Sequence, residues 1–87
     1  MPYAGVESYA EMMQMVKKPR PKRLSKDEIG KLMLIQFGAS QPATWRRHLE
    51  IMVMLHYIDP IVSSPGHYTV DWEKVDEDFE KAKEAMP

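Results

Sequence analysis

The fold is decided by residues 24–49, which read LSKDEIGKLMLIQFGASQPATWRRHL. The first part of this stretch carries a helix start: Ser25 is a good N-cap, and Glu28 follows three positions later to complete a capping box. Apolar residues then recur at helical spacing up to Gly38. Glycine readily adopts the left-handed conformation of a helix C-cap. The stretch therefore predicts a helix that starts after Ser25 and ends at Gly38.

A second helix is predicted only a short turn after that glycine. Ser40 is a good N-cap, and Pro42 fits the first turn because its missing N–H is not needed there; Gln41 is an equal candidate for the cap. We expect this helix to run to about His56, with Trp45 as its anchor in the core. Its second half is apolar almost all round, so other elements must cover it on several sides.

Residues 57–71 predict a β-hairpin. The segment 57–62 is rich in β-branched and aromatic residues, and Pro60 argues against a central strand. The sequence Ser63-Ser64-Pro65-Gly66 is typical of a turn. The segment 67–71 alternates polar and apolar residues, as a half-buried strand does.

A last helix is predicted to begin at Asp71, whose carboxylate suits the positive end of a helix dipole. Its outward face is strongly acidic. Its apolar stripe is interpreted as either core cover or a dimer seam, and the seam is favoured because this helix follows a complete domain. The stripe consists of Val75, Phe79, Ala82 and Met86.

The N-terminal part predicts a short amphipathic helix over residues 6–16, with a methionine-rich apolar face. An ordinary core stripe is the favoured interpretation. A flexible contact strip is the alternative, and it makes Tyr9 and Met12 candidates for a dimer interface. Residues 17–23, KKPRPKR, have two prolines at alternate positions, which predict an extended, solvated arm.

Length and composition fit one small domain of 87 residues in three parts: a helix with a basic arm in 1–23, a core in 24–72 and a final helix in 73–87. There is no cysteine, which excludes disulfides, thiolate metal sites and cysteine nucleophiles.

The charge is distributed unevenly along the chain. Residues 1–50 hold nine Lys/Arg and five Asp/Glu, a net of +4, whereas residues 51–87 hold three and eight, a net of −5. One basic face of such a protein can bind a polyanion.

The predicted order of elements is that of a winged helix-turn-helix. Residues 39–49, ASQPATWRRHL, resemble the recognition-helix segment of winged-helix transcription regulators of the ArsR, MarR and PadR kind, although the glycine usual in the closing segment is missing from His56-Tyr57-Ile58. The resemblance covers about residues 24–72 and implies a fold that is mainly α with a small β-hairpin (α+β), extended by a C-terminal helix. It also implies binding to double-stranded DNA, usually as a homodimer, with the helix from Ser40 in the major groove and the 57–71 hairpin as the wing.

The candidate DNA contacts come from three places. Arg46 and Arg47 point about 100° apart on a helix, so one can read a guanine edge while the other holds a phosphate. The arm can supply backbone contacts, since the wing has no Lys or Arg. The candidates are Ser40, Gln41, Thr44, Arg46 and Arg47 in the recognition helix, Lys17, Lys18, Arg20, Lys22 and Arg23 in the arm, and Ser64 and His67 at the wing.

No catalytic residue, metal site or cofactor is predicted. The sequence has no Gly-rich phosphate loop or serine elbow, and the chain is too small to enclose an active-site pocket alone. Its three histidines lack a second ligand at metal spacing, so His48 is expected to pack or form a hydrogen bond. No apolar run approaches the about 20 residues that cross a membrane.

The leading hypothesis is a dimeric, sequence-specific transcription regulator, cytoplasmic and nucleoid-associated, of a type frequent in archaea and their viruses. Two alternatives stay open. One is a DNA-segregation or nucleoid adaptor that coats DNA and recruits a protein partner through its acidic last helix. The other is a winged-helix protein–protein module without DNA binding.

Overall fold

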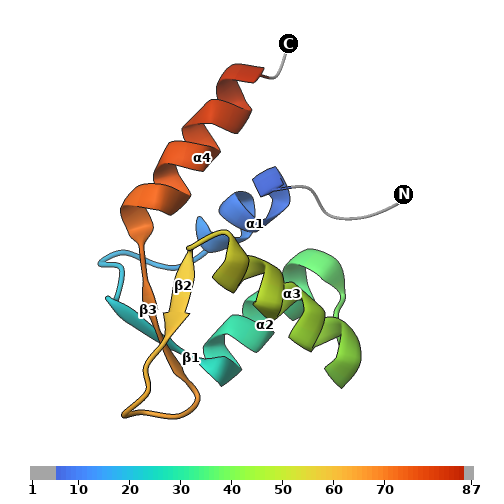
Figure 1. Ribbon diagram of the computed structural model, residues 1–87. Coiled ribbons are helices and arrows are strands. Elements are labelled where there is room, and N and C mark those ends of the chain that lie inside the picture. Colours follow the sequence, from blue (N-terminus) through green and yellow to red (C-terminus); the bar gives the residue numbers. More distant parts are fainter. Residues whose placement is uncertain (1–5, 86–87) are drawn as a thin grey trace.

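A computed structural model describes residues 6–85. Within this range the chain folds into four helices and one three-stranded antiparallel sheet (Figure 1), which confirms the predicted α+β class. The elements, in chain order, are α1 (Val6–Met13), β1 (Arg23–Ser25), α2 (Lys26–Phe37), α3 (Pro42–Met54), β2 (Ile58–Pro60), β3 (His67–Val70) and α4 (Trp72–Ala85).

Helix α2 begins and ends where its local sequence predicts. The Ser25 Oγ accepts a hydrogen bond from the Glu28 N–H at 3.2 Å, and the Glu28 carboxylate accepts one from the Ser25 N–H at 2.9 Å. The capping box is therefore complete. Gly38 closes the helix with a φ of 66°, and its N–H donates to the carbonyl of Leu34. This left-handed C-cap turns the chain toward α3.

Helix α3 uses Gln41 as its N-cap and Pro42 as its first residue, so Ser40 is not the cap. The helix ends at Met54, two residues before the predicted end. His56 has a positive φ of 65°, which redirects the chain into β2. The predicted helix was too long because the apolar pattern runs on past the point where the backbone leaves helical geometry.

The sheet has the strand order β1–β3–β2. Strands β2 and β3 are the predicted hairpin, with Ile58 opposite Val70, and Pro60 lies on an edge strand, where its missing N–H is tolerated. Strand β1 was not predicted: Leu24 pairs with Tyr68 of β3. Three residues are too few to display an alternating pattern, so the last residue of the expected arm belongs to the sheet.

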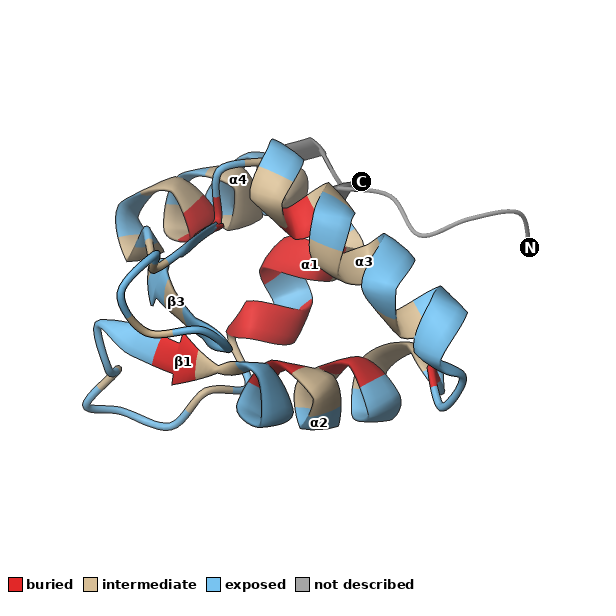
Figure 2. Cartoon of the chain, turned by 60° about the horizontal axis from the view of Figure 1, so that its bottom comes forward, coloured by how far each residue is buried: buried red, intermediate tan, exposed pale blue. Residues whose placement is uncertain are grey.

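The core is built around α1. Figure 2 shows α1, with its many buried residues, in the middle of α2, α3 and α4. Tyr9 and Met12 of α1 and Val75 of α4 are each at most 1% exposed, and α4 packs on α1. The prediction of these three side chains as dimer contacts is therefore wrong, since they fill the core of a single chain. Phe79 and Ala82 are half-buried, and Met86 lies outside the described residues.

In the described part of the chain, no helix combines the length and the apolar character that crossing a membrane requires.

Candidate nucleic-acid interface

The first half of α3 is held by two aromatic contacts. The Trp45 indole lies against α2 at Gly30, where a Cβ atom would come within 2.7 Å of the indole Nε1. One turn on, the His48 ring stacks on Phe37 with centroids 4.4 Å apart, and its Nδ1 shares a 2.7 Å hydrogen bond with the Tyr9 hydroxyl. Burial lowers the pKa of His48, so the neutral ring is favoured. The expectation that His48 packs or forms a hydrogen bond is confirmed, and the ring does both.

These contacts leave the opposite side of α3 free. Because Trp45 and His48 point inward, Arg46 and Arg47 are both exposed. Neither arginine forms an ion pair with any residue in the described range 6–85. The candidate contacts at the start of the recognition helix are thus all exposed. They are Ser40, Gln41, Thr44, Arg46 and Arg47.

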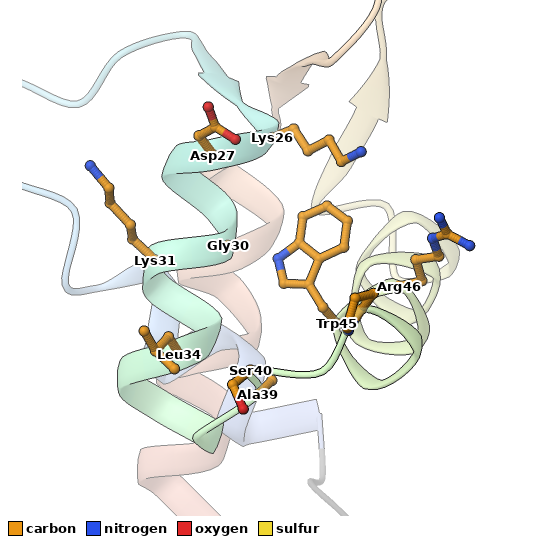
Figure 3. Close-up of a pocket in the computed structure, with 10 residues that line it drawn as sticks. Lys26, Asp27, Gly30, Lys31, Leu34, Ala39, Ser40, Trp45 and Arg46 are labelled. Atoms are coloured by element: carbon orange, nitrogen blue, oxygen red, sulfur yellow. The ribbon is translucent and has the colours of Figure 1, made fainter.

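A groove of about 640 Å³ separates the N-terminal halves of α2 and α3 (Figure 3). Gly30 forms its floor and the Trp45 indole stands at its side. The ammonium group of Lys26 lies 5.2 Å from the centre of the Trp45 ring, within range of a cation–π contact. Arg46 lines the same groove from α3. Lys26, the first residue of α2, was absent from the candidate contacts, although it lies only three residues after the basic arm.

The hairpin is attached to the N-terminus of α2. The Lys26 N–H donates a 2.7 Å hydrogen bond to the carbonyl of Gly66, which has the positive φ of 82° that the turn requires. His67 is exposed and pairs in register with Ser25 of β1, so it sits beside the start of α2. Ser64 is half-buried, and its carbonyl accepts the His67 N–H within the turn. The wing candidates therefore lie next to α2.

The arm is not uniformly solvated, because Arg20 is fixed to α4. Its side chain is 16% exposed, with one Nη donating to Asp76 at 2.7 Å and the other to Gln14 at 2.8 Å. The guanidinium also lies 4.5 Å from the centre of the Trp72 ring. The hydrogen bond from Arg20 is the main cause of a lowered pKa at Asp76. Arg20 is thus held by contacts within the chain, and its contact with DNA stays a prediction. The exposed bases of the arm are Lys17, Lys18, Lys22 and Arg23.

The acidic charge is concentrated on α4. Figure 1 shows α4 at one end of the molecule and the β2–β3 turn, with the start of α2, at the other. Most of α4 therefore lies away from α2, whereas the arm contacts the first turns of α4 through the Arg20–Asp76 ion pair. The exposed carboxylates of α4 include Glu73, Glu77, Glu80 and Glu84.

No group of three or more His, Asp or Glu side chains within residues 6–85 is arranged to hold a metal ion. Comparison with family models, with curated proteins and with solved structures finds no match. The functional assignment therefore rests on the residues and geometry of this chain.

Proposed function

We propose that this protein binds double-stranded DNA as a winged helix-turn-helix, with α3 in the major groove and the β2–β3 hairpin as the wing. One observation carries the proposal. The order α1–β1–α2–α3–β2–β3, with the sheet order β1–β3–β2, frames a helix whose exposed side holds two arginines without an ion-pair partner among residues 6–85. A helix of this kind fits the major groove of B-DNA, and its first turns reach the base edges.

The two arginines take different roles in this proposal. Arg46 lines the groove with Lys26, so these two cations suit a phosphate of the DNA backbone. Arg47 points about 100° away from Arg46 around the helix. Its planar guanidinium can donate two parallel hydrogen bonds to a guanine edge. Arg47 is therefore the proposed base reader.

Positive charge for the wing comes from β1. The hairpin itself has no Lys or Arg between residues 57 and 71. Arg23 lies opposite Thr69 in the sheet register, which brings one base to the strand beside the hairpin, and the exposed Lys22 precedes it. These residues are suited to sequence-independent backbone contacts, which set affinity and its salt dependence.

The proposed DNA contacts of Arg46 and Arg47 are tested by fluorescence anisotropy with labelled duplex fragments from the neighbourhood of the gene. Arg47→Ala is expected to weaken binding to the preferred fragment by about 1–3 kcal/mol. The matched control is Lys83→Ala, which removes one exposed cation from α4 and is expected to leave binding unchanged. Unchanged binding by the double variant Arg46→Ala/Arg47→Ala would show that α3 does not read DNA.

The arm is tested by its effect on salt dependence. Neutralising Lys17, Lys18, Lys22 and Arg23 is expected to lower the slope of log K against log[salt] by about 0.9 for each DNA phosphate that the protein no longer neutralises. The fragment preference is expected to persist, because backbone contacts carry no sequence information. A slope equal to that of the unaltered protein would remove the arm from the interface.

The DNA-binding unit in this proposal is the single chain, and a transcription regulator would use two such units. Two copies would occupy half-sites about 34 Å apart, one helical turn of DNA. Only Phe79 and Ala82 remain as described candidates for a dimer seam, since the others lie in the core or outside the described range. Sedimentation equilibrium with and without the preferred fragment measures the stoichiometry.

A protein-binding adaptor is the second candidate, favoured by exposed apolar side chains. Leu34 and Ile35 on α2 are 52% and 70% exposed, and Met54 at the end of α3 is 76% exposed. Such side chains are suited to contact with another protein. A pure adaptor would not bind duplex DNA at low salt, whereas an adaptor that coats DNA would bind cooperatively beyond one site.

A further inference from the structure

The groove between α2 and α3 combines an aromatic wall with several cations. Gly30 has no side chain, and the half-buried Trp45 indole packs against it, since a Cβ atom there would lie 2.7 Å from the indole Nε1. Leu34 adds an apolar side chain to the lining. Figure 3 shows Lys26 and Arg46 on the same side of the indole, while Lys31 extends from the other side of α2. The volume of about 640 Å³ is within the range of small-molecule sites.

The charge at the groove is positive and uncompensated. Lys26 and Arg46 provide two positive charges beside the indole, while the formal charges of Asp27 and of Lys31, which extends from the other side of α2, cancel. None of these four residues forms an ion pair with a described residue of the chain. A phosphate monoester carries about −1.5 to −2 at pH 7, whereas a carboxylate or an internal phosphodiester carries one negative charge. The groove is thus matched best to a monoester.

We propose that this groove binds one nucleotide that carries a terminal phosphate, with the base against the Trp45 indole and the phosphate between Lys26 and Arg46. Bases of every kind stack on aromatic side chains, so the site is expected to tolerate different bases. The ligand is either a free nucleoside monophosphate or the 5′-phosphorylated end of a strand. The site itself does not rest on the proposed duplex binding.

The site is tested by NMR titration of the full chain. Each of the two tryptophans gives one indole N–H resonance, and the one that disappears in Trp45→Phe is assigned to Trp45. Adenosine monophosphate is expected to shift this resonance saturably. Adenosine lacks the phosphate and ribose 5-phosphate lacks the base, so each is expected to bind at least about tenfold more weakly.

Charge variants test the role of the cations. Lys26→Gln and Arg46→Gln are each expected to weaken adenosine monophosphate binding by about fivefold or more, whereas Lys83→Gln on α4 is expected to leave it unchanged. All three side chains are exposed, so the fold is expected to persist, and the remaining resonances report this directly. If all three variants weakened adenosine monophosphate binding equally, the ligand would be attracted by the overall charge of the protein, and the proposed site would be wrong.

The remaining outcomes also decide the proposal. No shift of the Trp45 resonance at about 10 mM adenosine monophosphate, or equal binding of adenosine or of ribose 5-phosphate, would overturn it. A short single strand with a 5′-phosphate, compared with the same strand ending in a hydroxyl, identifies the source. Tighter binding of the phosphorylated strand than of the free nucleotide supports a strand end, and similar binding supports a free nucleotide. None of these measurements contains duplex DNA, so their failure is separate from failure of the proposed function.

Discussion

Substituting alanine for Gly30 tests the packing of α2 against α3, on which both the recognition surface and the groove depend. Two effects of opposite sign are expected. Inside a helix, alanine is more favourable than glycine by about 1 kcal/mol. The new Cβ, however, would lie 2.7 Å from Nε1 and 3.4 Å from Cε2 of the Trp45 ring. A rigid indole cannot bend away, so α3 or the whole ring must move.

The packing term is expected to win. Overpacking of this kind costs about 1–3 kcal/mol, so Gly30→Ala should lower the free energy of unfolding by about 1 kcal/mol after the gain in helix propensity. In a domain of this size that loss corresponds to about 4–8 °C in Tm. In a Trp45→Leu background the indole is absent, and Gly30→Ala should instead raise the free energy of unfolding by about 0.5–1 kcal/mol.

The double-mutant cycle consists of the unaltered protein, Gly30→Ala, Trp45→Leu and the double variant. Urea unfolding of these four proteins, monitored by circular dichroism, measures whether the effect of Gly30→Ala on the free energy of unfolding changes sign. Gly38→Ala is the matched control. Its φ of 66° strains any L-residue while no atom lies near its Cβ, so it should cost about 1–2 kcal/mol in both backgrounds. Equal stabilisation by Gly30→Ala with and without Trp45 would refute the indole contact and, with it, the floor of the groove.

Three further predictions concern caps and titration. Ser25→Ala should lower the free energy of unfolding by about 1 kcal/mol in urea, whereas Ser40→Ala should change it little because Ser40 is not the cap of α3; equal losses would contradict this assignment. The pKa of Asp76 is lowered by its hydrogen bond from Arg20, so its contribution to stability is present above the usual value of 3.8 and is lost as the pH falls through the folded-state pKa. Asp76→Asn should therefore make the free energy of unfolding depend less on pH below about 3.8. An unchanged pH dependence would argue against the Arg20 contact. The pKa of His48 is lowered by burial, so stability should begin to fall as the pH drops below the usual value of 6.5, and His48→Gln should remove this slope in thermal melts between about pH 5 and 7.

The sequence alone was sufficient where the interacting groups are close along the chain. The Ser25 capping box, the Gly38 C-cap and the proline at the start of α3 depend on atoms within a few residues of one another. Hydrogen bonds of this kind form from local dihedral preferences, so the sequence determined where α2 begins and ends, and it placed the start of α3 to within one residue. The turn at Gly66 follows the same rule, because glycine accepts its positive φ without strain.

The tertiary structure decided which equally plausible partners meet across long separations. Arg20 is one of five bases in the arm of residues 17–23, and only the placement of Asp76 on α4, 56 residues away, makes it a structural residue. Leu24 becomes a strand residue because Tyr68 arrives beside it. Burial of Tyr9 in the core instead of a dimer seam likewise depends on α2, α3 and α4 closing around α1. A residue pattern fixes the chemistry of a face, but the free energy of covering that face comes from the elements that pack on it, and these are brought together only when the whole chain folds.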